Sequence, residues 1–373
     1  MNISAGLLIV KDNKILLVKQ TVSGDSIYSI PKGCMMQSET LIDAAIRETH
    51  EESGIQIVKS DISAGPYLIN YVNDKGVLFK QVFYFVVRLT RSINNPTPID
   101  TEEIESACFF NVEEACTVIH WRQRCLLQHV DKKHIDKVEL EMLLNKEYIT
   151  KEKHPTQDLF IYNYTEKCKK EQYWNETTLW CRGLILNSKY EIIARPLKKF
   201  FEPEQLYPQV IPIEKPIRIS EKMDGALGIL YWINGLPRIT TRNSFTTAHA
   251  YKGTFLLYNK YAHAIPLLNE RYSYFFEIIY PQSKVVVDYG YIEDIFLLDA
   301  IDNVSGEEID GEDLQKLPFP KANNICNNLT IDELRDLNIV NQEGYVAKYN
   351  NHFRLKLKFD NYKQKHWRFK HEK

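Results

Sequence analysis

The sequence has few of the cysteine and histidine patterns that define zinc-binding or disulfide-linked proteins. Its seven cysteines are scattered, odd in number and never spaced as C-x-x-C. Neither a disulfide framework nor a zinc ribbon is therefore predicted. His120 with Cys125, or His129 with His134, are of metal-ligating types, but no second ligand pair accompanies them. We expect surface or packing roles for these four residues.

Long hydrophobic runs are also missing. No apolar stretch reaches the roughly 18 residues that a helix needs to span a bilayer. The segment 1–20 is interrupted by Lys11, Asp12 and Lys14, a pattern that predicts two strands around a turn rather than a signal peptide. We therefore expect a cytoplasmic protein with no membrane partner.

Bulk charge of one sign is absent as well. The formal net charge is −2, so affinity for nucleic acid must come from local basic patches. With 373 residues, 44% of them hydrophobic, the chain is long enough for two or three domains with their own cores. The sequence indicates no oligomeric state.

Residues 33–55 predict a helix. Ser38 is placed to cap its N-terminus, and Gly54 is placed to end it. Apolar residues recur on one face at helical spacing, where they can pack on a sheet.

Three carboxylates share a face of this helix. Glu48, Glu51 and Glu52 follow the i, i+3, i+4 spacing. Their mutual repulsion would be removed by a hard divalent cation such as Mg²⁺ or Mn²⁺. The alternative is a solvated acidic face with Arg47 as counter-ion.

The spacing of the whole stretch is more specific. Gly33 is followed after five residues by Glu39, and after seven more by the run RETHEESGI, from Arg47 to Ile55. This resembles the Nudix box without a gap, with Thr49 standing where the family usually has an aliphatic residue. Residues 1–125 as a whole resemble a Nudix hydrolase domain.

That resemblance implies an α/β/α sandwich that hydrolyses a nucleoside diphosphate linked to another group. The residues that would hold Mg²⁺ or Mn²⁺ and carry catalysis are Glu48, Glu51 and Glu52. The structural positions of the box would be Gly33, Glu39, Arg47 and Gly54, with Arg47 orienting Glu48. Glu103 or Glu105 would add a ligand or base. Pro31-Lys32-Gly33 resembles Nudix enzymes that act on dinucleoside polyphosphates, diphosphoinositols or capped RNA.

The remainder of the chain changes in character. Residues 126–156 are highly charged with roughly helical apolar spacing and predict a helical connector. From residue 157 to 373, aromatic strand-like runs dominate.

Within those runs lies Glu221-Lys222-Met223-Asp224-Gly225, which has the form of a nucleotidyl-lysine site. Such a lysine must act as a neutral amine, although its ordinary pKa is about 10.4. Nearby cations disfavour the charged amine and stabilise a pentavalent phosphorus. A working site therefore requires basic residues around Lys222, with carboxylates for Mg²⁺. The alternative is an ordinary turn lysine.

The required residue types are present along the chain. Lys356 and Lys358 alternate on one predicted strand and face the same side. Glu277 and Glu343 lie in or beside apolar strands, where a carboxylate needs a partner. The basic residues that precede the lysine site are Arg182, Arg195 and Lys199. Taken singly, each fits a surface charge or a salt-bridged strand residue.

Residues from about 159 to 362 resemble ATP-dependent RNA ligases of the bacteriophage RNA ligase 1 type. The stretches that carry this resemblance are WNETTLWCRGLIL, ARPLKKFF, EKMDGALG, TRNSF, YFFEIIYPQSKVVVDYG, IFLLDA, EGYVA and FRLKLKFDNY. It implies an ATP-grasp-like nucleotidyltransferase domain on antiparallel sheets, and thus a chain of mixed α/β and α+β class. Only 15 residues follow Lys358, so the further OB domain of capping enzymes and DNA ligases is not expected.

The resemblance also implies roles for individual residues. Lys222 would take AMP from ATP, and Glu343 would contact metal and ribose. Lys356 and Lys358 would bind the α-phosphate. The other residues of the nucleotide and phosphate site would be Glu221, Asp224, Gly225, Arg182, Lys199, Arg242, Glu277 and Phe296. Arg242 stands where the family often has a lysine.

Three hypotheses of function follow. The preferred one is a bifunctional RNA end-processing enzyme: an RNA ligase that joins 5′-phosphate and 3′-hydroxyl ends, with a Nudix half that supplies 5′-monophosphates. A second joins the ligase to a small-molecule pyrophosphatase of ADP-ribose or dinucleotides. A third, non-enzymatic hypothesis makes one half a binding module for RNA or nucleotides.

Overall fold

The structure is a computed structural model that describes residues 2–22, 25–73, 75–130, 135–206, 211–212, 214–309, 311–325, 329–349 and 353–371. His134 lies outside this part of the chain. The chain divides into two compact units, Met1–Thr150 with Tyr164–Leu179 and Lys151–Asn163 with Trp180–Lys373. In the described residues no helix is both long and apolar enough to cross a membrane.

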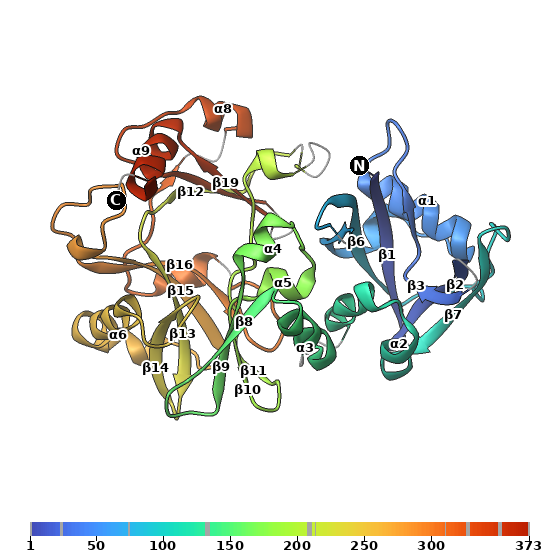
Figure 1. Ribbon diagram of the computed structural model, residues 1–373, viewed down its shortest axis with the longest axis horizontal. Coiled ribbons are helices and arrows are strands. Elements are labelled where there is room, and N and C mark those ends of the chain that lie inside the picture. The colour runs from blue at the N-terminus through green and yellow to red at the C-terminus, as the bar shows by residue number, and fades with distance from the viewer. Residues whose placement is uncertain are drawn as a thin grey trace. The chain divides into compact units, whose positions relative to one another are not determined.

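The first unit is built on a seven-stranded mixed sheet. Five strands follow the order β3-β2-β1-β6-β5, while β4 pairs with β1 and β7 with β2. Figure 1 labels β1, β2, β3, β6 and β7 of this sheet. The central pair, β1 and β6, is parallel. The two strands predicted for the N-terminal segment are β1 and β2. The bounds are β1 (Asn2–Lys11), β2 (Lys14–Val22), β3 (Asp25–Ser29), β4 (Lys32–Cys34), β5 (Ile62–Val72), β6 (Leu78–Leu89) and β7 (Ile104–Asn111).

Helices cover both faces of this sheet. Leu8 and Val10 of β1 pack into a core with Ala115 of α2 (Val112–Val118) and with the 3₁₀ helix Trp121–His129. Because side chains alternate along a strand, Leu7 and Ile9 of β1, also fully buried, point to the other face. Helix α1 (Leu41–Ser53) lies against β1 and β4 and buries Leu41, Ala44 and Ala45. This is the predicted sandwich.

Helix α1 ends at the predicted residue, but it begins at a different one. Its N-cap is Thr40, whose hydroxyl accepts a hydrogen bond from the Asp43 N–H. Ser38, the predicted cap, instead has φ 77° and lies in the turn before the helix; that prediction was wrong. Gly54 ends the helix at φ 71°, with its N–H donating to the His50 carbonyl, as glycine readily does.

The predicted connector, residues 126–156, contains both a helix and a strand. Helix α3 (Lys137–Asn145) is followed by β8 (Ile149–Lys153). Two short helices, α4 (Glu166–Lys170) and α5 (Glu176–Trp180), come later. The buried carboxylate of Glu139 in α3 accepts hydrogen bonds from Asn175 Nδ2 and Thr177 Oγ1, both at 2.7 Å. Burial raises the pKa of Glu139 to about 8. Its hydrogen-bond partners, Asn175 and Thr177, are both uncharged.

The second unit contains three sheets of four strands each. Their strand orders are β11-β10-β9-β8, β17-β12-β18-β19 and β14-β13-β15-β16, and the pairs within the last two are antiparallel. The bounds are β9 (Leu159–Tyr164), β10 (Arg182–Asn187), β11 (Ile192–Ala194), β12 (Arg218–Lys222), β13 (Ala226–Ile233), β14 (Leu236–Thr241), β15 (Tyr272–Ile279), β16 (Asp294–Asp302), β17 (Asn324–Ile325), β18 (Gly344–Lys348) and β19 (Arg354–Lys358).

Helices pack on two of these sheets. Helix α6 (Ala248–Lys260) lies beside β14 and β13 (Figure 1) and buries Leu256 and Leu257 against them. The core beneath β12, β18 and β19 includes Ile331 and Leu334 of α8 (Ile331–Asp336) and Tyr362 of α9 (Asp360–His371). Helix α7 (Gly311–Lys316) contacts β16.

A buried network of charges joins the β12-β18-β19 sheet to β16. Asp299 of β16 is 1% exposed. Its carboxylate lies 2.6 Å from Arg354 of β19 and 2.7 Å from Arg218 of β12. Arg354 also pairs with Glu308, which lies 2.6 Å from Lys348 of β18. Each buried charge therefore has an opposite charge in contact, the condition under which such groups are tolerated.

Removing one member of this network leaves its partners buried without compensation. We expect Arg354→Leu to lower the free energy of unfolding of the second unit by about 3–5 kcal/mol, measured by urea denaturation. Arg335→Leu is the matched control, because Arg335 forms solvent-exposed pairs with Asp332 and Glu204, each worth at most about 1 kcal/mol. Equal losses in the two variants would contradict the assignment.

Candidate active sites

One arginine gathers the carboxylates of the predicted Nudix box. Arg47 Nε and Nη2 donate to the carboxylate of Glu39 at 2.7 and 3.0 Å. Its Nη1 lies 2.7 Å from Glu48 and 2.9 Å from Glu51. Its Nη2 also donates to the Cys34 carbonyl at 2.9 Å, which fixes the helix to β4. Glu39 and Glu48 hold the pKa of Arg47 above its usual range.

Gly33 lies against the end of the Glu48 side chain, which would have to move if position 33 carried a Cβ atom. A Cβ atom at this position would fall 1.9 Å from Glu48 Oε2. The backbone of β4 therefore passes directly over the carboxylate of α1. The adjacent Lys32 N–H donates to Glu52 Oε2 at 2.9 Å, so β4 holds Glu52 in place as well.

Two of the three helix carboxylates are sheltered from water. Burial raises the pKa of Glu52 to about 7, despite the favourable charge of Lys32. Burial likewise raises the pKa of Glu48, although Arg47 opposes the shift. Glu51 is the more exposed member. These carboxylates lack sufficient positive charge, and such oxygen donors suit a hard divalent cation.

The residues therefore fit Mg²⁺ or Mn²⁺ by their chemistry. In the described part of the chain, however, no three His, Cys, Asp or Glu side chains already surround a metal position. Of the two further candidates, Glu103 lies near enough to Glu52 for its negative charge to help raise the pKa of Glu52. Glu105 instead forms an ion pair with Lys19 at 2.7 Å, which orients it toward β2.

Lys80 of β6 is a neighbour of this site that the sequence did not indicate. Burial lowers the pKa of Lys80, and so does the nearby charge of Lys32, while Glu48 and Glu52 oppose the shift. Lys80 lies opposite Asn2 in the parallel pairing of β1 and β6. Nothing local distinguishes it from any other strand lysine, so only the fold reveals it.

The nucleotidyl-lysine motif lies where the chain passes from one sheet to another. Lys222 is the last residue of β12, and β13 begins at Ala226. In the strand pairing, Lys222 lies opposite Gly344 of β18, which lies opposite Lys358 of β19. A Cβ on Gly344, at φ 148°, would fall 1.9 Å from the Leu357 carbonyl oxygen. The middle of this row must therefore be a glycine.

Glu343 bridges the two lysines of that row. It is 3% exposed. Its Oε2 accepts from Lys222 Nζ at 2.7 Å, and its Oε1 contacts Lys358 Nζ at 2.8 Å. The amine of Lys222 is thereby oriented.

Other cations lie close to Lys222. Burial lowers the pKa of Lys356 to about 8, and the charges of Lys358, Lys222 and Arg182 act in the same direction, opposed by Glu202. The Arg182 guanidinium lies over the Phe200 ring, 5.3 Å from its centroid. The structure thus brings together the predicted basic residues of β10, β12 and β19.

Glu277 of β15 faces the same place from the second sheet. Its Oε1 accepts from the Gly225 N–H at 3.0 Å. Burial raises the pKa of Glu277 to about 7, although Lys222 opposes the shift. Phe296 of β16 lies directly opposite Glu277 in the strand pairing. A Cβ on Gly225 would lie 2.6 Å from the Ile278 carbonyl oxygen, so this close approach requires glycine.

Asp224 is used within the protein. Its carboxylate accepts from the N–H groups of Val286 and Val287 at 2.8 and 2.9 Å, and from the Tyr362 hydroxyl at 2.7 Å. Its own N–H donates to the Tyr289 hydroxyl at 2.8 Å. Asp224 therefore anchors the turn that follows Lys222, and its predicted nucleotide contact stays a prediction. Tyr289 and Tyr362 lie in two of the stretches that carry the ligase resemblance, but neither was assigned a role from the sequence.

The remaining predicted residues occupy varied places. Lys199 Nζ donates to the Phe200 carbonyl at 2.7 Å and lies 4.1 Å from the Phe201 ring centroid. Glu221 accepts from Asn323 Nδ2 at 2.8 Å. Arg242 lies beside Gly183, at the end of β14. Arg195, by contrast, is buried, and its Nε donates to the Asn303 carbonyl at 2.8 Å, which gives it a structural part.

Comparison with known families divides the chain in the same way. Residues 2–130 match the family described as NUDIX domain, and residues 180–363 match the family described as RNA ligase. The chain therefore combines a Nudix hydrolase domain with an RNA ligase domain.

Individual relatives cover only parts of the chain. The RNA ligase of Rhodothermus phage RM378 is 26% identical over 204 residues, which cover 44% of this chain and 45% of that protein. The phosphatase NudJ of Escherichia coli K12 is 33% identical over 54 residues, 14% of this chain and 35% of that protein. The chain thus spans less than half the length of these relatives.

Solved structures similar to the chain include a MutT NUDIX hydrolase from Burkholderia pseudomallei. It is 19% identical, with a TM-score of 0.30, over 34% of this chain and 95% of that one. A C. elegans Ap4A hydrolase is 21% identical, with a TM-score of 0.29, over 39% of this chain and 99% of that one.

The raised pKa of Glu52 predicts a pH-dependent stability without metal. Between its ordinary value of 4.5 and about 7, the folded protein holds a proton that the unfolded chain has lost. The free energy of unfolding therefore falls as pH rises through this window, by about 3 kcal/mol at 1.36 kcal/mol per unit. We expect Glu52→Gln to abolish most of this loss, measured in chelator by hydrogen exchange of the α1 amides at pH 5 and pH 8. Glu113→Gln, at an exposed position of α2, is the control; a Glu52→Gln profile identical to wild type would refute the prediction.

Proposed function

We propose that the chain is a bifunctional enzyme of RNA end processing, an ATP-dependent RNA ligase with a Nudix pyrophosphohydrolase. We place the Nudix domain at residues 1–125, the connector at 126–156 and the ligase domain at 157–373. The observation that carries the ligase half is the row Lys222, Gly344, Lys358 with Glu343 beneath it.

The first step of the ligase half is self-adenylylation. Lys222 Nζ releases a proton to solvent and attacks the α-phosphorus of ATP, so that a nitrogen–phosphorus bond forms, the bond from that phosphorus to its bridging oxygen breaks and pyrophosphate departs. Lys356, Lys358 and Arg182 lie where they can stabilise the negative charge that develops on phosphorus. Gly225 and Glu277, facing the same space, would position the nucleoside.

Two transfers then complete ligation. The 5′-phosphate of an RNA takes AMP from Lys222, and the amine is regenerated. A 3′-hydroxyl then attacks the activated phosphorus, so that a phosphodiester forms and AMP leaves. Glu343 and the neighbouring carboxylates would contact Mg²⁺ or Mn²⁺ and ribose during these steps.

The Nudix half cleaves a phosphoanhydride bond with water. Glu48, Glu51 and Glu52 would hold the divalent cation, which polarises the pyrophosphate and lowers the pKa of its bound water. Arg47 and the glycine at position 33 keep Glu48 in place. Its product, a 5′-monophosphate, is what the ligase half requires, so we propose triphosphate-bearing, capped or adenylated RNA as its substrate.

Two variants separate the activities. We expect Lys222→Ala to abolish labelling of the protein by ATP that carries a tagged α-phosphate, because no other group replaces the amine, while pyrophosphate hydrolysis continues. Lys189→Ala, an exposed lysine of the same unit, is the control and keeps the label. Labelling of the Lys222→Ala protein would refute the assigned nucleophile.

The converse variant tests the Nudix half. We expect Glu51→Gln to reduce hydrolysis by about tenfold to a hundredfold or more, the loss that even outer partners of a metal cause, and to spare lysine labelling. Mass analysis of 5′-triphosphate, capped and adenylated RNAs, beside ADP-ribose and dinucleotides, identifies the substrate. Cleavage of the small molecules alone would replace RNA trimming by the small-molecule pyrophosphatase hypothesis. Glu113→Gln serves as the control.

A further inference from the structure

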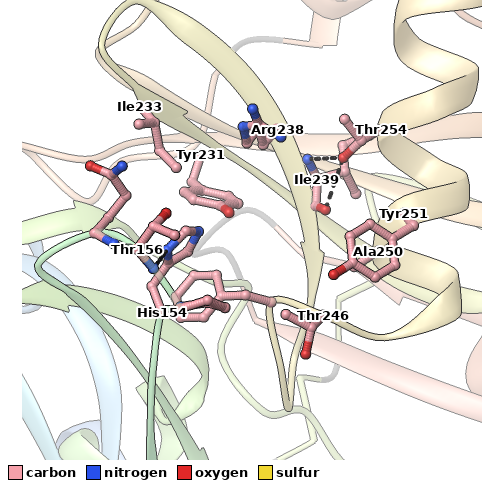
Figure 2. Close-up of a pocket in the computed structure, with 13 residues that line it drawn as sticks. His154, Thr156, Tyr231, Ile233, Arg238, Ile239, Thr246, Ala250, Tyr251 and Thr254 are labelled. Carbon is pink, nitrogen blue, oxygen red and sulfur yellow. Dashed lines mark hydrogen bonds between the residues drawn. The ribbon is translucent and has the colours of Figure 1, made fainter.

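One cavity of the ligase unit has no place in the chemistry described above. It has a volume of about 330 Å³, at the lower end of the range for small-molecule sites. It lies between the turn after β8, strands β13 and β14, and the first turns of α6 (Figure 2). None of the residues placed around Lys222 lines it.

Aromatic rings form one wall of this cavity. His154 and Phe245 have centroids 4.8 Å apart in an edge-to-face arrangement, and Tyr231 lies 5.4 Å from Phe245. Tyr251, 63% exposed on α6, lies across the opening from them (Figure 2). Such rings offer faces and edges to a planar ligand, and an exposed tyrosine at the rim leaves room for one.

The polar groups of the wall are hydrogen-bond donors. His154 Nδ1 accepts from the N–H groups of Thr156 and Gln157 at 3.2 and 3.1 Å, so the ring proton of neutral His154 lies on Nε2. Burial lowers the pKa of His154, and so does the nearby charge of Arg238, which keeps the ring neutral at pH 7. Burial raises the pKa of Tyr231 to about 12, so its hydroxyl also keeps its proton.

The mouth of the cavity carries one cation and no anion. Arg238 of β14 is exposed, and its guanidinium has no hydrogen bond or ion pair with any residue that the structure describes. No aspartate or glutamate is among the lining residues. The nearby Glu152 carboxylate is engaged by the Ser244 hydroxyl at 2.6 Å. The site therefore favours a ligand that is planar, accepts hydrogen bonds and carries negative charge.

We propose that this cavity binds a nucleotide, with its base among the rings of His154, Tyr231 and Tyr251 and its phosphate at Arg238. Stacking on aromatic faces is tolerant of base identity, and arginine contacts phosphate through paired donors. The nucleotide comes either from solution or from an unpaired position of an RNA strand. In the second case the cavity holds the substrate strand at a point away from the reacting ends.

The test measures binding without any chemistry. The full chain, in chelator and without ATP, is titrated with a fluorescein-labelled hexauridylate blocked at both ends, and fluorescence anisotropy gives Kd. We expect Arg238→Ala and Tyr251→Ala each to raise Kd about fivefold or more, the loss typical of one stacked base. Both side chains are exposed, so their removal leaves the core intact.

Matched variants control for surface effects. Tyr291→Ala removes a tyrosine that is 98% exposed, and Arg335→Ala removes an exposed arginine of the same unit. Each should keep Kd within about twofold of wild type. If uridine monophosphate displaces the labelled hexauridylate from wild type but not from Arg238→Ala, the cavity binds a free nucleotide. If uridine monophosphate does not displace it from wild type, the ligand is a nucleotide within an RNA strand. An unchanged Kd in either pocket variant would overturn the proposal. Failure of Lys222 to take AMP would leave this test unaffected, because no ATP is present.

Discussion

The ion network around Asp299 sets the geometry on which the ligase site depends. Lys222, Lys356 and Lys358 belong to the β12-β18-β19 sheet, whereas Glu277 belongs to β15 of the neighbouring sheet. The two sheets must be held in register for these side chains to meet. Arg354 and Arg218 reach from the first sheet to Asp299 on the second, and the geometric demands of a buried ion pair make that register specific.

Each of the two candidate sites gathers charges of mainly one sign, negative in the Nudix domain and positive in the ligase domain. In the Nudix domain, carboxylates outnumber the cations beside them, and burial raises the pKa of Glu48 and Glu52. In the ligase domain, cations outnumber carboxylates, and burial lowers the pKa of Lys356. The first site is thereby suited to a metal ion and the second to phosphate. In both, a glycine allows backbone to pass close to the charged side chain.

The sequence was sufficient where function depends on spacing within one element. The carboxylates of α1 and the alternating lysines of β19 were recognisable because a helix and a strand have fixed periods. The cap of α1 was misplaced by two residues because Ser38 and Thr40 are both capping types, and the more favoured serine was chosen. No role was assigned to Lys80, Tyr289 or Tyr362, because their contacts in the sites arise only through tertiary packing. The strand β8 was missed because its charged residues mimic a polar helix.

Because Glu343 lies between two lysines, the number of cations that neutralise it depends on whether Lys222 carries AMP. In the proposed reaction, Lys222 exchanges an ammonium group for an uncharged nitrogen bonded to phosphorus. Glu343 then keeps one cationic partner, Lys358, where it had two. Oε2 of this buried carboxylate therefore loses its cationic partner when AMP becomes attached to Lys222. Empty and loaded enzyme thus differ in local electrostatics even before RNA arrives.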